Sequence, residues 1–232
     1  MAARIFPTED TDLFVNNGFA ITLPLLDSCT LNDLDFVLSQ LQKNTAGTRQ
    51  LLDFLWCSDL ALRIRQHSLV RPFLALDAVA VQCTYFEKSK DQNWLVPLHQ
   101  DLNIPVKERI THPDLTVWSE KEGLVFVQPT NEMLRQLVAV RLHIDECDLT
   151  DGPLRVVPMS HKNGRLSNQA AIETRDRMGE VICPVEKGGA LIMSPLLLHA
   201  SSKASGESKR RVLHFVYGPT ILSHGLNWRY AI

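Results

Sequence analysis

Three side chains of the sequence could bind one metal ion together. His99 and Asp101 are two residues apart in a run, 94–104, that we expect to be a strand, where such residues point to the same side. His199 ends an apolar run that follows a glycine turn at 188–189. Two imidazoles and one carboxylate on one face of an octahedron leave three positions open for a co-substrate and oxygen. These residues therefore predict a mononuclear non-haem iron(II) site.

Two observations keep other interpretations open at this point. The pair His-x-Asp is weak on its own, because His143 and Asp145 repeat it at the end of another apolar run. We expect one of the two pairs to be structural. His199, taken alone, could equally be a hydrogen-bonded histidine of the core.

An arginine pair beyond His199 points to a co-substrate. 2-Oxoglutarate chelates iron through its keto acid end, so its far carboxylate needs a buried cation, ideally the planar fork of an arginine. Arg210 and Arg211 are the candidates. Strand alternation turns only one of them inward, but the serine-rich segment after His199 prevents a choice by counting.

Helices are expected to precede the elements that carry these residues. The first 75 residues read as helical, with one helix capped by Thr30 and a second from Asp59 to about Leu69 that ends before Pro72. We expect these helices to pack against the outside of a sheet.

Short strands are expected to hold the candidate residues. Turn residues separate eight β-rich runs, and no repeat or linker marks a domain boundary. We predict a mainly β, cupin-like jelly roll in one domain, 1–232, with a helical N-terminal segment at 1–75, a β core at 76–218 and a tail at 219–232. The predicted strands are 78–86, 94–104, 124–127, 137–144, 154–157, 181–185, 190–199 and 212–217.

The composition excludes several classes of function. The 24 Lys and Arg nearly balance the 26 Asp and Glu, and no basic run is present, which argues against nucleic acid as a partner. No apolar stretch reaches the roughly 18 residues of a membrane span, and the start lacks a signal core. Five cysteines without a CxxC pair fit reduced thiols, so we expect a cytoplasmic protein with a small-molecule substrate. The sequence gives no prediction of the oligomeric state.

Three separated motifs together resemble the phytanoyl-CoA dioxygenase family. They are WLVPLHQD at 94–101, GPLRVVPMSHK at 152–162 after an Asp-rich turn, and the segment 188–211, and they occur in the family's order. The resemblance covers about residues 76–218. It implies a double-stranded β-helix that binds Fe(II), with 2-oxoglutarate and O₂ as co-substrates. It also implies hydroxylation of an unactivated C–H bond of a small molecule, with succinate and carbon dioxide as co-products.

The resemblance also implies which of the open candidates carry the site. The family's metal pair precedes the Asp-rich turn, which matches His99 and Asp101. The family's 2-oxoglutarate arginine lies eleven residues beyond the distal histidine, which matches Arg210 and leaves Arg211 as an outward neighbour. Halogenating relatives lack the carboxylate, so Asp101 indicates hydroxylation.

Two positions depart from the family's pattern. Arg141 stands where members often place an aromatic residue over the co-substrate, and Met159 stands where Pro-Gly-Ser-His is usual. Arg141 and His143 share a strand face, so we expect them to contact the substrate, although a salt-bridged strand arginine is an equal alternative.

Further cofactor-binding candidates precede the metal pair. Gln82, Thr84 and Lys88 lie in the strand before it. Lys88 could reach the co-substrate carboxylate or lie exposed to solvent. Trp228 in the tail could cover the entrance or pack at the core edge.

Two other classes of function stay open on the sequence. One is a cupin-type metal enzyme, an isomerase or a dioxygenase without 2-oxoglutarate, although these usually bind metal through three or four histidines. The other is a metal-free small-molecule-binding barrel. No basic cluster away from Arg210 could hold the phosphates of coenzyme A, so we expect a free small molecule as substrate.

Overall fold

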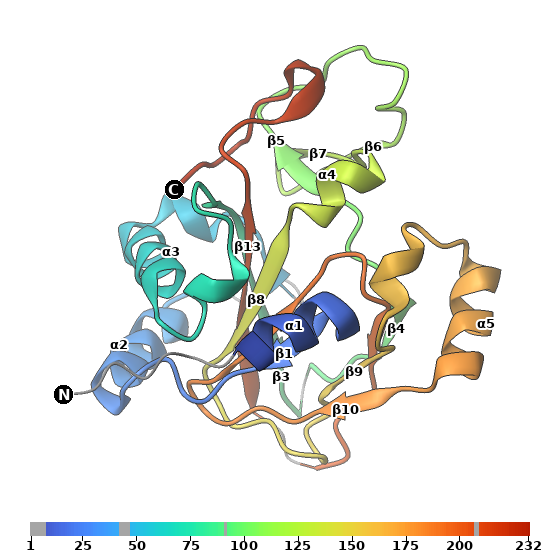
Figure 1. The fold of residues 1–232 in the computed structure, drawn as a ribbon. Coiled ribbons are helices and arrows are strands. Elements are labelled where there is room, and N and C mark those ends of the chain that lie inside the picture. The colour runs from blue at the N-terminus through green and yellow to red at the C-terminus, as the bar shows by residue number, and fades with distance from the viewer. Residues whose placement is uncertain (1–7, 42–46, 91, 207–208) are drawn as a thin grey trace.

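Three antiparallel sheets build the β core (Figure 1). The computed structural model describes residues 8–41, 47–90, 92–206 and 209–232. The main sheet has the strand order β1 (Phe19–Ile21), β11 (Ala190–Met193), β8 (Val138–His143), β13 (Arg210–Gly218), β3 (Val79–Lys88), β2 (Gly47–Thr48). The second sheet has the order β10 (Val181–Cys183), β9 (Leu154–Val156), β12 (His199–Ser201), β4 (Val96–His99). The third has the order β5 (Ile104–Val106), β7 (Leu124–Val127), β6 (Trp118–Lys121).

The predicted mainly β architecture with N-terminal helices is confirmed. The main and second sheets together line a cavity, as a jelly roll requires. The helices are α1 (Thr8–Asn17), α2 (Ser28–Ser39), α3 (Leu55–Gln66), α4 (Asn131–Arg135) and α5 (Asn168–Met178), with short 3₁₀ turns η1 (Leu51–Asp53), η2 (Arg71–Phe73), η3 (Ser160–Asn163) and η4 (Ser223–Gly225).

Two predicted strands are each split in the structure. The run 94–104 becomes β4 and β5, which belong to different sheets, so Asp101 lies in the loop between them and not in a strand. The run 190–199 becomes β11 and β12, because the chain crosses from the main sheet to the second sheet there. Pro195 lies in this crossing and cannot donate a ladder hydrogen bond.

The N-terminal part differs from the prediction in its helix ends. The cap of α2 is Asp27, whose carboxylate accepts a hydrogen bond from the Thr30 backbone N–H at 2.8 Å, so the predicted Thr30 cap is wrong by one turn. α3 begins at Leu55, four residues before the predicted start, and Pro72 lies in η2. The strands β1 and β2, which the sequence analysis did not predict, pair with opposite edges of the main sheet.

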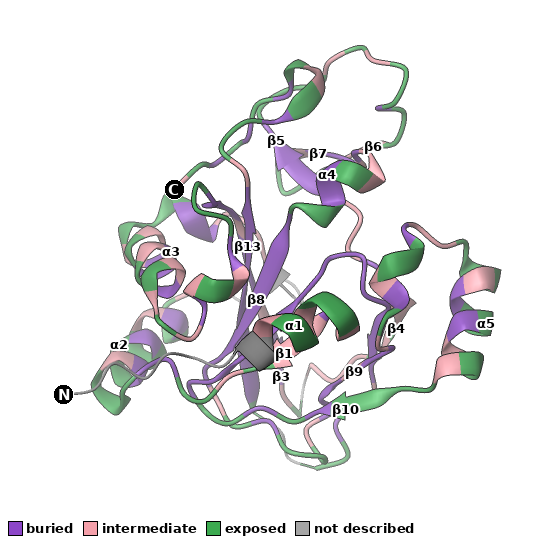
Figure 2. Cartoon of the chain, in the orientation of Figure 1, coloured by how far each residue is buried: buried purple, intermediate pink, exposed green. Residues whose placement is uncertain are grey.

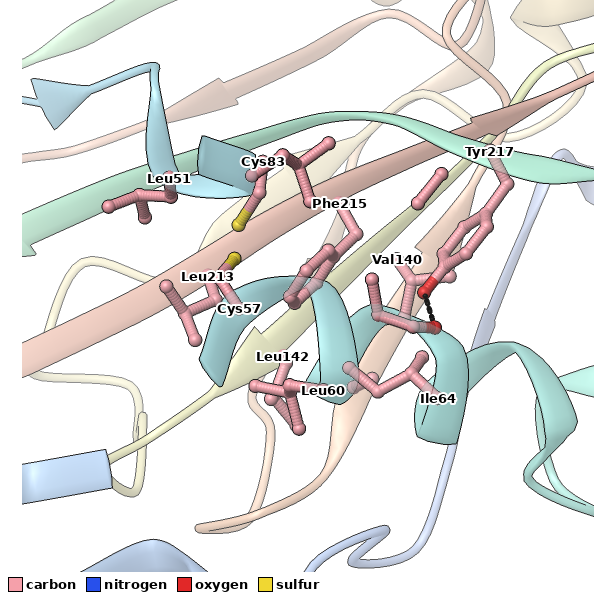
Figure 3. Packing of buried hydrophobic residues seen from close by; sticks show 14 of the residues in the cluster. Leu51, Cys57, Leu60, Ile64, Cys83, Val140, Leu142, Leu213, Phe215 and Tyr217 are labelled. Atoms are coloured by element: carbon pink, nitrogen blue, oxygen red, sulfur yellow. Dashed lines mark hydrogen bonds between the residues drawn. The ribbon is translucent and has the colours of Figure 1, made fainter. Parts of the chain in front are cut away.

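α3 covers the outer face of the main sheet (Figure 3). Alternate residues of β13, namely Leu213, Phe215 and Tyr217, are fully buried in this apolar cluster. The Tyr217 hydroxyl donates a hydrogen bond to the Ala61 carbonyl oxygen at 2.9 Å, which ties the strand to the helix. Arg210, His214 and Val216, at the alternate positions of β13, face the opposite side of the sheet and line the cavity.

β8 and β13 are buried along their whole length, as Figure 2 shows. β13 pairs with β8 on one side and with β3 on the other, so its register is fixed twice. None of the described helices has both the length and the apolar composition that a membrane span needs.

Candidate active site

A cavity of about 330 Å³ lies between the main and second sheets. Its polar lining comes from every strand that the sequence analysis assigned to the site. The main sheet contributes Gln82, Thr84, Phe86, Ala139, Arg141, Arg210, His214 and Val216. The second sheet contributes Val96, His99, Leu154, His199 and Ser201. The remaining lining residues are Arg49, Trp94, Gln100, Asp101, Leu102, Asn103, Lys121, Phe126, Leu137 and Pro195.

The three predicted metal ligands meet in this cavity. His99 ends β4 and His199 begins β12, and the two residues are directly paired in the second sheet. Nε2 of His99 lies 3.7 Å from Oδ1 of Asp101, and Nε2 of His199 lies 3.7 Å from Oδ2. One ligand atom from each side chain lies within 4.8 Å of the other two. This spacing suits three donors around one ion.

Gln100 holds Asp101 in place although no strand does. The buried Gln100 amide donates to the carbonyl oxygens of Gly164 and Leu196 at 2.8 and 2.6 Å, and its oxygen accepts from the Leu166 N–H at 2.9 Å. The Asp101 backbone N–H donates to the Pro195 carbonyl oxygen at 2.9 Å. The loop between the two ligands is therefore fully anchored, and the predicted pairing of His99 with Asp101 on one side survives without strand alternation.

Hydrogen bonds set the tautomer of both histidines. Nδ1 of His99 lies 2.8 Å from the Pro97 carbonyl oxygen, and Nδ1 of His199 lies 2.9 Å from the Leu197 carbonyl oxygen. A carbonyl oxygen can only accept, so each Nδ1 carries a proton, and Nε2 is the nitrogen that faces Asp101 and would bind a metal ion.

The protonation states also suit a divalent cation. Burial lowers the pKa of His199 to about 4, although the carboxylate of Asp101 opposes the shift, so the imidazole is neutral at pH 7. Burial raises the pKa of Asp101, but the surrounding histidines and the Arg141 guanidinium outweigh it and lower the pKa to about 2. One carboxylate and two imidazoles form a donor set that fits iron(II).

The two neighbouring arginines point to opposite sides of β13. Arg210 lines the cavity, is 4% exposed, donates to the Gly152 carbonyl oxygen and leaves its Nε without a hydrogen-bond partner. Arg211 donates from Nε and Nη2 to the two carboxylate oxygens of Asp145 at 2.8 and 2.7 Å and also pairs with Asp35. Arg210 is thus a buried cation that fits a carboxylate, and Arg211 is a structural ion-pair partner.

The second His-x-Asp pair does not meet in one site. Asp145 is engaged by Arg211. His143 is buried, but it is not among the residues that line the cavity. Burial and the nearby Arg141 and Arg210 hold the pKa of His143 well below its usual value.

The predicted cofactor-binding residues of β3 lie at or next to the cavity. Gln82 and Thr84 line it, and the Gln82 amide donates to the Thr84 hydroxyl at 3.0 Å. Lys88 is 1% exposed, so the exposed alternative is wrong. Its ammonium donates to the Ser201 hydroxyl at 2.9 Å and to the Ser202 carbonyl oxygen. Burial, with Arg210 nearby, lowers the pKa of Lys88 to about 7.

His214 is a site residue that the sequence analysis missed. Its Nε2 lies 3.7 Å from Oδ2 of Asp101, and its Nδ1 accepts a hydrogen bond from the Arg141 guanidinium at 3.1 Å. Burial, with Arg141 adding to it, lowers the pKa of His214 to about 3. Strand alternation was the signal that could have found it, because His214 is four residues beyond Arg210 in a predicted strand.

The C-terminal tail packs at the core edge. Trp228 belongs to a second apolar cluster with Val106 and donates its indole N–H to the Pro219 carbonyl oxygen at 2.7 Å. It is not among the residues that line the cavity. A second group of possible metal ligands, His112, Asp114 and His224, lies largely exposed and outside this cavity.

Comparison with known proteins agrees with this fold. The model of the phytanoyl-CoA dioxygenase family matches residues 39–212, which is most of the chain. No curated protein sequence matches the chain.

Several solved structures share the fold. EctD from S. alaskensis in its apo form matches with a TM-score of 0.68 and 13% identity, covering 95% of this chain and 80% of EctD. HygX from Streptomyces hygroscopicus, with nickel and 2-oxoglutarate bound, matches with a TM-score of 0.66 and 16% identity, covering 98% of this chain and 97% of HygX. SnoN, a non-haem α-ketoglutarate-dependent epimerase from nogalamycin biosynthesis, matches with a TM-score of 0.67 and 13% identity, covering 91% of this chain and 80% of SnoN. The predicted double-stranded β-helix is thereby confirmed.

Proposed function

This chain belongs to the phytanoyl-CoA dioxygenase family, a family of Fe(II)- and 2-oxoglutarate-dependent oxygenases, and we propose that it hydroxylates an unactivated C–H bond of a small molecule. The observation that carries the proposal is the meeting of His99, Asp101 and His199 with the buried Arg210 in one cavity.

His99, Asp101 and His199 would hold iron(II). The neutral imidazole of His199 and the ionised carboxylate of Asp101 would bind a divalent cation without prior loss of a proton at pH 7. Iron, 2-oxoglutarate and oxygen together supply the oxidising power that breaks a C–H bond, while 2-oxoglutarate becomes succinate and carbon dioxide. The protein's own share is to orient the reactants and to exclude water.

Arg210 would bind the far carboxylate of 2-oxoglutarate. Its unpartnered Nε and its burial fit a carboxylate that replaces the missing hydrogen bond. Lys88 pairs in register with Arg210 and donates to Ser201, so Lys88 and Ser201 would add hydrogen-bonding groups at this end of the cavity. Gln82 and Thr84 line the cavity at the level of Val216 and His214, where they would contact the part of the co-substrate nearer the metal. HygX, which shares the fold, has 2-oxoglutarate bound in its structure.

The size of the cavity supports a small substrate. A volume of about 330 Å³ is at the lower end of ligand sites and must also hold 2-oxoglutarate. We therefore expect a free metabolite and not a coenzyme A thioester.

Anaerobic titration with iron(II) and 2-oxoglutarate tests the proposal. The wild-type protein should develop the weak visible charge-transfer band of the chelate, and His99→Ala should lose it. His143→Ala, which removes the histidine of the second His-x-Asp pair, should keep the band. A folded wild-type protein without the band would contradict the proposal and favour a metal enzyme without 2-oxoglutarate or a non-catalytic barrel.

A further inference from the structure

A second buried guanidinium lines the cavity beside the one that the proposed function uses. Arg141 on β8 is 8% exposed and lines the cavity. Burying an unpaired charge costs several kcal/mol in proteins, so a buried arginine needs a partner. The contacts of Arg141 indicate what that partner is.

No described side chain forms an ion pair with Arg141, and the carboxylate of Asp101 acts on it only at longer range. Its Nη1 donates to the neutral imidazole of His214, and the guanidinium lies 5.4 Å from the centroid of the Phe86 ring. Its Nε is buried without a hydrogen-bond partner. None of the ion pairs among the described residues includes Arg141.

The charges around the cavity are unequal. Among the described lining residues the cations are Arg49, Lys121, Arg141 and Arg210, and Asp101 is the only carboxylate. Arg49 is already paired with Glu122, and Lys121 is exposed. In the proposed function a metal ion compensates the negative charge of Asp101, and a carboxylate of 2-oxoglutarate compensates the positive charge of Arg210. Arg141 then remains as the one buried cation of this lining without an anion.

Arg141 and Arg210 lie at different levels of the sheet. Arg141 pairs in register with His214, which is four residues from Arg210 along β13, or about 13 Å of strand. His214 lies beside Asp101, so Arg141 belongs to the metal end of the cavity. A co-substrate anchored on Arg210 therefore leaves Arg141 for a second molecule near the point of oxidation.

We propose that Arg141 binds a carboxylate group of the substrate, which makes the substrate a small organic acid. This inference rests on the proposed function. One planar fork with one charge matches a carboxylate in two parallel hydrogen bonds. A phosphate dianion would call for further buried cations at this end of the cavity.

Matched acid and amide probes test the assignment. Wild-type protein is loaded anaerobically with iron(II) and saturating 2-oxoglutarate, and the visible band is followed while butanoate, hexanoate, octanoate or the corresponding primary amide is added. At least one carboxylate should shift the band at a concentration about tenfold or more below that of its amide, as expected for a charged hydrogen-bonded pair. Equal responses to acid and amide, or no response to any acid, would overturn the proposal.

Two variants separate Arg141 from the other cations. Arg141→Gln should reduce the preference for the acid to less than about threefold, whereas Arg49→Gln, which removes a cation already paired with Glu122, should keep it. The concentration of 2-oxoglutarate that gives half of the band should stay within about threefold of wild type in both variants. A large rise of this 2-oxoglutarate concentration in the Arg141→Gln variant would assign Arg141 to the co-substrate and overturn the proposal. Failure of wild type to form the band would instead contradict the proposed function.

Discussion

The two faces of the main sheet are built from the same strands but carry different kinds of side chain. On the outer face, Leu213, Phe215 and Tyr217 of β13 pack under α3 with Val140 and Leu142 of β8 (Figure 3). On the inner face, the intervening positions of the same strands carry Arg210, His214 and Arg141. Both faces are buried, but the outer face is mainly apolar, with the ion-paired Arg211 at its end, whereas the inner face carries charged and imidazole side chains.

This difference shows how a double-stranded β-helix separates stability from chemistry. Apolar burial on the outer face stabilises the fold by roughly 1.5–3 kcal/mol for each large side chain. The charged inner face costs free energy because buried ions lose their hydration. The outer face must therefore offset what the inner face costs, and substitutions on the two faces should change different properties.

The largest effect is expected from the outer face. Phe215→Ala should lower the free energy of unfolding by about 3–5 kcal/mol, because a fully buried ring leaves a cavity between the sheet and α3. Urea unfolding measures this loss. The folded fraction of the variant should still form the iron and 2-oxoglutarate band at wild-type concentrations, and a weakened band would show that the two faces are not independent.

The neighbouring arginines offer a sharper comparison within one dipeptide. Arg210→Ala should raise the 2-oxoglutarate concentration for half of the band by about 100-fold, or about 2.7 kcal/mol, because a buried charged hydrogen bond is lost. Arg211→Ala should change that concentration less than about threefold and should instead lower stability, because Asp145 loses its ion-pair partner. Equal effects on 2-oxoglutarate would show that the inferred facing of these two residues is wrong.

A charge on the inner face should make stability depend on pH. Burial lowers the pKa of Lys88 to about 7 from 10.5, so between these values the unfolded chain binds more protons than the folded one. Stability of wild type should therefore rise relative to Lys88→Met between pH 7 and pH 9, by up to about 1.4 kcal/mol per pH unit. Urea unfolding curves of both proteins at pH 7, 8 and 9 measure this change. A difference in the free energy of unfolding that stays constant with pH would contradict the lowered pKa of Lys88.

The smallest effect is expected at a residue that belongs to neither face. Met159 has a φ of 65°, in the left-handed region that glycine adopts more easily, and nearly half of its side chain is exposed. Met159→Gly should stabilise the protein by about 0.5–1 kcal/mol, because relief of backbone strain exceeds the added flexibility of the unfolded chain. Thermal unfolding measures the gain. A loss of stability would mean that side-chain packing of Met159 outweighs the strain.

Local sequence patterns predicted much of the fold and of the site. The runs around His99 and His199 and the arginine pair were recognisable because ligand types, apolar strands and turns recur at fixed spacings. Arg141 was identified as an inner-face residue by alternation with His143, and it lines the cavity. The roles of both residues toward a substrate stay predictions.

Features that depend on distant parts of the chain could not be predicted in this way. Lys88 lies in a polar stretch, and it is buried against Ser201 of the second sheet and Ser202, which directly follows that strand. Asp101 is positioned by Gln100, whose partners at 164 and 196 are far away in sequence. Which strand edges receive β1 and β2 also depends on packing that no local period records.

The double pairing of β13 has a consequence for how the protein could vary. Its register is held by β8 and β3 over most of its length, not by the segment that connects it to β12. An insertion or deletion beside the exposed Ser205 and Gly206 would lengthen or shorten that connection while Arg210 still faced inward. The eleven-residue interval from His199 to Arg210 is therefore open to evolutionary drift and to loop grafting, whereas a one-residue slip of β13 itself would exchange the roles of Arg210 and Arg211.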